Sequence, residues 1–399
     1  MRIFLLKLVT ITLILLPISY LYAADKKDFN IGYYDLENDI RYDEWGVHPV
    51  DIRSNTNQLY KRPIAGARLG LKDIKPFQRM AKSKFNLKEF RIKDIDSAPE
   101  NILEHIKSNN IQIILIDFPA EELLKVIDKI SFLNIPIINI SSKNNILRST
   151  HCHENLFHTI PSERMLSDSL AQYLSDKKWR KILMLTGPLD NDKAKAASFI
   201  ESAKQFGLKI IGNRDFLLGN DPRARDQNDL DFLTGSAKYD AVYIADTHKE
   251  FSYKVPFATH KPSAVIGSSG LTPRAWHWSY LRHGAPQVHG RFERMNDRRM
   301  SEEDWAAWVG MRAIAEALVR FKNKENFSFH EAFINDNFKL DGSKGPVLNF
   351  RSWNRQLRQP IMLSTENWVT SIAPIESFVH RENNLDTIGI DSAKNKCSK

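Results

Sequence analysis

The stretch "THCHENLFHTIPSERM", residues 150–165, places one cysteine between two histidines, and a third histidine follows five residues later. Thiolate and imidazole groups are ligands that zinc prefers, and a structural zinc site needs four ligands, a catalytic one three. On a strand, His151 and His153 point to one side and Cys152 to the other. With His158 more distant, the stretch offers an incomplete set of ligands. We therefore predict that the protein holds no metal here.

The N-terminus indicates the compartment in which these side chains work. Arg2 and Lys7 flank the start of an apolar run, the segment 8–18 has no charge, and Ala23 stands before an expected cleavage point. This order is typical of a secretory signal peptide. The apolar run is shorter than the roughly 20 residues that span a bilayer. We predict that residues 1–23 are removed and that the mature chain is exported.

The chain has only two cysteines, Cys152 and Cys397. Thiols of exported proteins meet oxidising conditions and tend to pair. A bridge would connect the C-terminal tail to the middle of the chain. Two free thiols are the alternative, because sequence alone cannot place the two Cα atoms within bonding range.

Length and charge limit the function classes. Removal of residues 1–23 leaves 376 residues and lowers the formal charge from +9 to +7, since Arg2 and Lys7 are lost. A chain of this size normally divides into two lobes. Its basic residues are dispersed among acidic ones and no nucleic-acid motif is present, so we expect no nucleic-acid partner.

Motifs of catalysis are missing from the sequence. There is no Gly-x-Ser-x-Gly elbow, no phosphate loop and no His-Glu-x-x-His. The segment "GSSG" (267–270) has serines beside glycines, but no base can be assigned to them. We predict a protein that is not an enzyme and that carries no cofactor.

Two series of alternating strands and helices position these residues. Apolar strands are predicted at 29–36, 111–118 and 135–140, and again at 181–187, 239–246 and 263–270. A helix is predicted over 64–82, bent or broken by Pro76. Apolar strands separated by helices are typical of parallel sheets covered on both faces. The sequence thus predicts two doubly wound α/β units, with residues 150–165 at the junction between them.

Beyond residue 271 the composition changes to tryptophan-rich helices and short strands. The segment "SEEDWAAWVGMRAIAEALVRF" (301–321) opens with a capping-box-like pair, Ser301 and Asp304. Trp305 and Trp308 fall on the same face at helical spacing, which predicts a buried amphipathic helix.

Four segments carry a resemblance to a known family. They are "GARLGLKDI", "IPIINISS", "NLFHTIPSERMLSDSLAQYL" and "KILMLTGPLDNDKAKAASFIESAKQFGLKII". By these segments and by their order along the sequence, the chain resembles the type I periplasmic solute-binding proteins of ABC transporters, in particular the leucine/isoleucine/valine-binding class. The resemblance implies two doubly wound lobes joined by three crossovers, which close over a small-molecule ligand by a hinge. It also implies a periplasmic monomer that delivers its ligand to an ABC permease in the inner membrane.

Three further segments narrow the resemblance. They are "DPRARDQNDLDFLTGSAKYDAVYIAD", "AWHWSYLRHGAPQVHGRFERMNDRRMSEEDWAAWVGMRAI" and "RQLRQPIMLS". They look like the solute-binding proteins found with pyrroloquinoline-quinone-dependent alcohol dehydrogenase systems, which implies a quinoprotein dehydrogenase as a possible partner. The alternative within the same fold is a ligand sensor, or an accessory protein of that dehydrogenase, without transport.

The resemblance also gives a division of the chain. Lobe one is expected to comprise residues 24–141 and 271–345, and lobe two residues 142–270 and 346–380. Residues 381–399 form a tail. Since Cys152 falls at the entry to lobe two, we predict that a bridge to Cys397 tethers this tail at the lobe junction.

Ligands of open α/β sheets bind outside the carboxyl ends of the strands. The predicted ligand-binding residues are therefore the polar side chains that follow the strands: Asp117, Ser141, Ser142, Asn144, Asp190, Asp246, Thr247, Ser268 and Ser269. Hydroxyl groups suit an anionic or polar end of a ligand, and a carboxylate suits a cationic one. The alternative is that each residue caps the following helix or turn.

The connection after the first strand departs from the family. The amino-acid binders carry a short hydroxyl-rich loop there, whereas this chain has "ENDIRYDEWGVHPVDIRSNTNQLYKRP". Long loops of this kind are often functional. We predict Arg41, Tyr42 and Trp45 at the rim of the pocket, and an ordinary aliphatic amino acid as ligand becomes doubtful. Trp276 could face a ring-bearing or cationic ligand, or pack the hinge instead.

Overall fold

The computed structural model describes residues 27–42, 62–218, 226–235, 238–323 and 327–397. The predicted signal peptide and Trp45 lie outside these residues. The helices are α1 (Ile64–Ile74), α2 (Ala98–Asn109), α3 (Ala120–Ile130), α4 (Glu163–Asp176), α5 (Asp190–Gln205), α6 (Leu230–Thr234), α7 (Ala285–Asn296), α8 (Glu302–Phe321) and α9 (Phe329–Ile334). Among the described helices, none combines the length and apolar composition of a membrane span.

The strands fall into four sheets. They are β1 (Lys27–Leu36), β2 (Ser83–Ile92), β3 (Ile111–Asp117), β4 (Ile137–Asn139), β5 (Leu156–His158), β6 (Lys181–Thr186), β7 (Lys209–Asp215), β8 (Ala241–Ala245), β9 (Ala264–Gly267), β10 (Thr272–Arg274), β11 (Leu340–Asp341), β12 (Val347–Phe350), β13 (Leu357–Arg358), β14 (Ile361–Ser364) and β15 (Val369–Ala373). The two larger sheets are parallel, with orders β2-β1-β3-β4-β5 and β7-β6-β8-β9.

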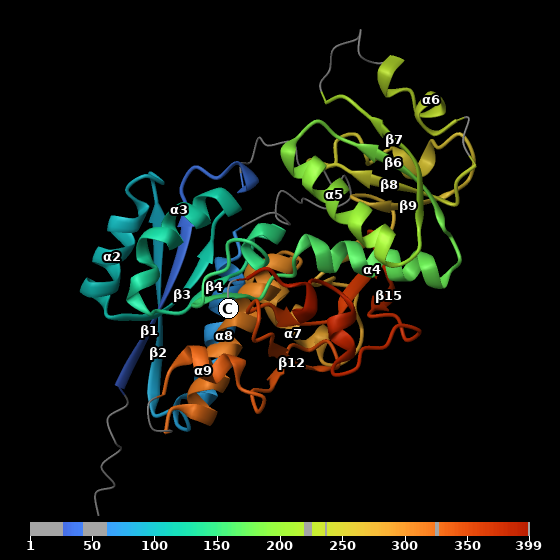
Figure 1. The fold of residues 1–399 in the computed structure, drawn as a ribbon. Coiled ribbons are helices and arrows are strands. Elements are labelled where there is room, and N and C mark those ends of the chain that lie inside the picture. The colour runs from blue at the N-terminus through green and yellow to red at the C-terminus, as the bar shows by residue number, and fades with distance from the viewer. Residues whose placement is uncertain (1–26, 43–61, 219–225, 236–237, 324–326, 398–399) are drawn as a thin grey trace, which may run out of the picture.

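The first parallel sheet is covered on both faces, as its continuous apolar strands predict. Successive residues of β3 enter different cores because strand side chains alternate between faces. Ile114 packs with α2 and α3, whereas Leu115 packs with α1 and α8. The resulting lobe occupies the left of Figure 1, with α2 and α3 on its outer side.

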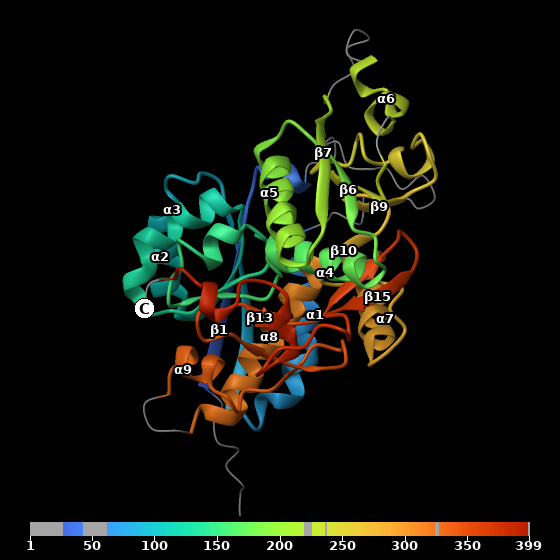
Figure 2. The same cartoon turned by 45° about the vertical axis from the view of Figure 1, so that its right-hand side comes forward.

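The second parallel sheet forms the other lobe, at the upper right of Figure 1. Helices α4 and α5 cover one face, where Met184 of β6 is buried, and α6 with the segment around Val255 covers the other, where Leu183 is buried. Figure 2 shows the two lobes from a second side, with the short antiparallel strands β10 and β15 below the second sheet. The predicted doubly wound α/β class with two lobes is confirmed.

The close approach of α1 to α8 explains the glycines of "GARLGLKDI". A Cβ atom on Gly66 would lie 2.0 Å from the carbonyl oxygen of Asp304, and one on Gly70 would lie 2.6 Å from Cβ of Met311. Side chains larger than hydrogen cannot fit there. Helix α1 ends at Ile74 and a 3₁₀ turn containing Pro76 follows, as the proline predicted.

A series of hydrogen bonds joins three segments of the polypeptide between the lobes. Nζ of Lys344 donates to the carbonyl of Ala275 at 2.7 Å and to Oε1 of Gln359 at 2.8 Å. Nε2 of Gln359 in turn donates to the carbonyl of Thr159 at 2.7 Å. All these groups are buried, so the three crossovers are tied together at one point.

Two segments lie in another lobe than the predicted boundaries at residues 142 and 346 would place them. Strand β5 (156–158) follows residue 142 but pairs with β4 in the first sheet, because its buried apolar residues complete the edge of that sheet. Leu348 and Leu357, which we assigned to lobe two, pack in the core of lobe one. The lobe boundaries as a whole remain a prediction.

Candidate functional site

The carboxyl end of β3 places Asp117 in a cluster with two residues of the connection after β1. Nη2 of Arg41 donates to Oδ1 of Asp117 at 3.0 Å, and the hydroxyl of Tyr42 donates to the same oxygen at 3.1 Å. Arg41 also forms a bidentate contact with Asp39. The structure thus brings together three predicted site residues, Arg41, Tyr42 and Asp117.

Electrostatics keeps Arg41 charged and Tyr42 neutral in this cluster. Burial opposes the charge of Arg41, but the carboxylates of Asp117 and Asp39 raise its pKa above the ordinary value. Burial and the neighbouring Asp117 raise the pKa of Tyr42, so its hydroxyl stays protonated and donates. Because Asp117 is fully buried and already accepts both donors, its carboxylate serves to hold the loop after β1 in place.

At the carboxyl end of β4, the chain turns around the side chain of Asn139. Its Oδ1 accepts the backbone N–H groups of Ser141 at 3.2 Å and Ser142 at 2.9 Å. Asn144 accepts the N–H of Ile146 and caps a 3₁₀ turn. Ser141 is different, since its buried hydroxyl has no hydrogen-bond partner among the described atoms.

At the carboxyl end of β8, Asp246 organises the loop that follows. Its carboxylate accepts the backbone N–H groups of Lys249 at 3.0 Å and Ser252 at 2.8 Å. The hydroxyl of Ser268 accepts the N–H of Asp246 at 2.9 Å, which connects the ends of β8 and β9. Ser269 follows Ser268 and is half-buried. The carboxylate of Asp246 therefore holds the backbone and has a structural role.

Asp192 is a residue of this edge that the sequence did not single out. It is buried in the first turn of α5, where it accepts the N–H of Leu189 at 3.2 Å and that of Thr247 at 2.6 Å. It thereby holds the loops after β6 and β8 together. The hydroxyl of Thr247 is buried without a partner in the described part of the chain.

Two predicted site residues do not join these clusters. The side chain of Asp190 is fully exposed at the start of α5. Trp276 is 2 % exposed within the core of lobe one and stacks on Trp305, with ring centroids 6.3 Å apart. This placement agrees with the packing alternative for Trp276.

Charged residues that the sequence did not single out lie where the two lobes meet. Nζ of Lys143, after β4, lies 2.5 Å from Oε1 of Glu302 and 3.5 Å from Oε1 of Glu303. Glu302 also accepts the N–H of Ala275, which follows the crossover strand β10. Burial opposes its charge, but Lys143 and Arg274 lower the pKa of Glu302 to about 2.

Lys249, after β8 of the second sheet, and Arg274, on β10, form no ion pair in the described ranges, although the charge of Glu302 acts on both from a distance. Burial and the charges of Arg274, Lys195 and Lys143 lower the pKa of Lys249 to about 7, against the opposite effect of Glu302. Lys143 follows β4 of the first sheet and Lys249 follows β8 of the second, so the loops at the carboxyl ends of the two sheets lie within electrostatic range of each other. The sequence could have indicated both residues, because each follows a strand by a few positions.

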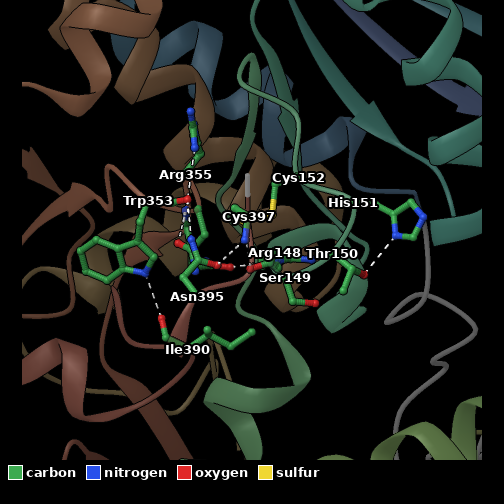
Figure 3. The surroundings of a disulfide bond; sticks show 12 residues. Arg148, Ser149, Thr150, His151, Cys152, Trp353, Arg355, Ile390, Asn395 and Cys397 are labelled. Atoms are coloured by element: carbon green, nitrogen blue, oxygen red, sulfur yellow. Dashed lines mark hydrogen bonds between the residues drawn. A yellow bond between two sulfur atoms is a disulfide. The ribbon is translucent and has the colours of Figure 1, made fainter. Parts of the chain in front are cut away.

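The histidines of residues 150–165 have separate surroundings. Cys152 is bonded to Cys397, with Cα atoms 5.4 Å apart. His151 lies to one side of the disulfide, and its Nδ1 is hydrogen-bonded to the hydroxyl of Thr150 (Figure 3). His153 lies beside Asp128, and His158 is buried beside Asn139. No set of three or more potential metal ligands is found in the described ranges.

The disulfide confirms the predicted pairing and holds the tail. Figure 3 shows Trp353 and Asn395 beside it, with Nδ2 of Asn395 donating to the carbonyl of Trp353 at 2.8 Å. Further up the tail, Gly389 donates its N–H to Asp168 of α4 at 2.7 Å. The tail thus contacts the helix that opens lobe two and is bonded to the segment before β5 of lobe one.

Two open hollows lie elsewhere, on the outer surface of lobe one. One, of about 430 Å³, is lined by residues of α7, including Arg291 and Arg294. The other, of about 670 Å³, lies between α1 and the first half of β2 and is lined by Lys84 and Phe85. Neither is lined by the residues after the carboxyl ends of the strands.

No protein-family model matches the sequence, and no curated protein matches it. Solved structures match in fold. A periplasmic binding protein from Burkholderia mallei superposes with a TM-score of 0.66 at 10 % identity, over 93 % of this chain and 99 % of that one. The chain has the fold of the type I periplasmic binding proteins.

Two further structures with this fold have named ligands. The leucine-, isoleucine-, valine-, threonine- and alanine-binding protein from Brucella ovis has a TM-score of 0.66 at 14 % identity, covering 84 % of this chain and 89 % of that one. A solute-binding protein of an ABC transporter from Rhodopseudomonas palustris, in complex with 3,4-dihydroxybenzoic acid, has a TM-score of 0.62 at 13 % identity, covering 85 % and 93 %. Identities this low establish the fold alone.

Proposed function

We propose that the protein is a periplasmic solute-binding receptor that captures a small polar molecule between its two lobes. The observation that carries the proposal is that Lys143 and Lys249, which follow the carboxyl ends of different sheets, both interact with the charge of Glu302, Lys143 by direct contact and Lys249 at longer range. Ligands of doubly wound sheets bind at such ends. A solute there would contact both lobes at once and would favour their closed arrangement.

Delivery to an ABC permease is the most direct use of such a receptor. Solved structures of the same fold include a branched-chain amino acid transporter substrate-binding protein from Streptococcus pneumoniae in complex with isoleucine. The apolar N-terminus supports export through a cleaved signal peptide, with the mature receptor acting in the periplasm as a monomer. The remaining predicted site residues, such as Ser141 and Thr247, are proposed to line the cleft.

A link to quinoprotein alcohol oxidation rests on the three long segments quoted above and on nothing else. In that setting the receptor would serve a pyrroloquinoline-quinone-dependent alcohol dehydrogenase system. A sensor or accessory protein of the dehydrogenase is the alternative, and it would bind the same solute without a permease. A permease gene adjacent to this one would favour transport, whereas a dehydrogenase gene alone would favour the alternative.

The receptor function is tested by thermal unfolding of the mature protein, residues 24–399, with a panel of solutes. The panel contains alcohols, aldehydes, carboxylic acids, amino acids, pyrroloquinoline quinone and metal ions. A ligand at 100 times its Kd adds about 2.7 kcal/mol to the stability of the folded protein. We expect at least one organic solute to raise the Tm. A large shift with a metal ion and none with any organic solute would overturn the proposal.

A further inference from the structure

The two lobes differ in how their charges are compensated where they meet. In lobe one, Lys143 is paired with Glu302 and Glu303. Lys249, which follows β8 of lobe two, and Arg274, on the crossover strand β10, make no ion pair with any described residue. Arg274 and Lys249 repel each other, and Glu302, which is already paired with Lys143, opposes this repulsion from a distance. An added negative charge would relieve the repulsion further.

Buried polar atoms without partners occur on Arg274 itself and on the two loops that carry Lys249 and Lys143. Nε of Arg274 is buried and has no hydrogen-bond partner among the described atoms, and the same holds for the hydroxyl of Thr247. Thr247 belongs to the loop of Lys249, and Ser141, with its own unpartnered hydroxyl, stands two residues before Lys143. Folded proteins keep few such groups, and each one needs an explanation. Nε of Arg274 and the hydroxyl of Thr247 are donors that a ligand with hydrogen-bond acceptors would satisfy.

The backbone presents Lys249 in a fixed conformation. Its φ angle is +60°, in the left-handed region that side chains other than glycine seldom adopt. Asp246 stabilises this conformation by accepting the N–H of Lys249 at 3.0 Å. Uncommon backbone conformations of this type gather at ligand-binding sites. Asp246 is therefore a positioning residue for Lys249.

We propose that Lys249 and Arg274 form an anion-binding site, and that the receptor takes a small organic anion with a carboxylate or phosphate group. The inference rests on the proposed receptor function and specifies its ligand class. Arg274 supplies a planar guanidinium suited to two oxygens, and Lys249 adds a compact charge. The carboxylates at these strand ends, Asp117 and Asp246, are occupied by internal donors. A cationic ligand would lack a free acidic partner there.

The test compares acids with their neutral counterparts by thermal unfolding and calorimetric titration of the mature protein. Benzoate is compared with its neutral counterpart benzamide, and butyrate with butyramide. Inorganic phosphate is tested separately, so that carboxylate binding is distinguished from phosphate binding. The variants are Lys249→Gln, Arg274→Gln and the charge-preserving Lys249→Arg. Lys181→Gln is the matched control, because Lys181 is exposed at the opposite, amino end of the same sheet.

We expect an acid or phosphate to bind and its neutral counterpart to bind at least tenfold more weakly. Lys249→Gln and Arg274→Gln should each weaken anion binding roughly ten- to hundredfold, as expected for lost charge-assisted hydrogen bonds. Lys249→Arg should restore part of the affinity, and Lys181→Gln should leave it unchanged. Binding of neutral solutes without preference for anions would overturn the anion site and leave the receptor function standing. Failure of every solute to bind would overturn both.

Discussion

At the scale of single residues, the polar groups that follow the strands divide into two kinds. Asp117, Asp192 and Asp246 are buried and hold backbone or side chains of the protein itself. Lys249 and Arg274 have no such partner in the described residues. The three aspartates fix the loops at the carboxyl ends of the strands, and the two cationic side chains are those that we propose for the ligand.

The lowered pKa of Lys249 gives anion binding a defined pH dependence. Burial and the charges of Arg274, Lys195 and Lys143 lower this pKa to about 7, and Glu302 opposes them. A bound anion favours the charged lysine, so above pH 7 binding must take up a proton. Affinity should be flat below pH 7 and fall by up to tenfold per pH unit above it.

Calorimetric titration of an anion between pH 6 and 9 measures this dependence. The Lys249→Arg variant serves as the control, because an arginine keeps its charge over the whole range, and its affinity should not change with pH. An unchanged affinity of the wild-type protein from pH 7 to 9 would show that the titration of Lys249 is not linked to binding.

At the scale of elements, the contact of α1 with α8 depends on Gly66. A Cβ atom there would meet backbone atoms of Asp304, which cannot move without shifting α8. We expect Gly66→Ala to lower the free energy of unfolding by about 3 kcal/mol, the upper part of the range for overpacked cores. Urea unfolding measures the difference.

Gly290 in α7 is the matched control for this prediction. A Cβ atom at that position would approach only the flexible end of Arg294, at 3.4 Å. Because alanine favours helix by about 1 kcal/mol over glycine, Gly290→Ala should be neutral or stabilising. Equal effects of the two substitutions would mean that the close approach of α1 and α8 does not exist in solution.

The disulfide between Cys152 and Cys397 should contribute to stability because it closes a loop of 245 residues. Restricting so long a loop in the unfolded chain stabilises the folded state by about 2–5 kcal/mol. Replacing both cysteines with serine should lower the free energy of unfolding by this amount. Reductant should destabilise the wild-type protein and leave the double variant unaffected. Two reactive thiols in the non-reduced protein would contradict the bond.

At the scale of the whole molecule, the sequence predicted the sheets better than the site. Continuous apolar runs such as Ile111–Asp117 allow little besides a buried parallel strand. The helix predicted over 64–82 begins at Ile64 but ends at Ile74, since Pro76 breaks it. The short strand β5 was missed, because three residues give no periodicity and its partner lies earlier in the chain.

Prediction of the site was limited by a different cause. The rule that ligands bind at strand ends points to loops, but it does not tell which side chains in those loops are unpaired in the folded protein. Asp246 follows β8 directly and holds the loop, whereas Lys249 has the unpaired charge. Arg274 lies on a crossover strand that no strand-end rule includes. Such distinctions depend on contacts between distant segments, for example Glu302 with Lys143.

The central claim is that a solute is held between two lobes that close around it. Small-angle X-ray scattering of the mature protein, with and without a saturating ligand from the thermal screen, tests this most directly. We predict that the ligand lowers the radius of gyration of the wild-type protein, and that Lys249→Gln needs a higher ligand concentration for the same change. Identical scattering of the free and the fully bound protein would contradict closure of the lobes around the ligand.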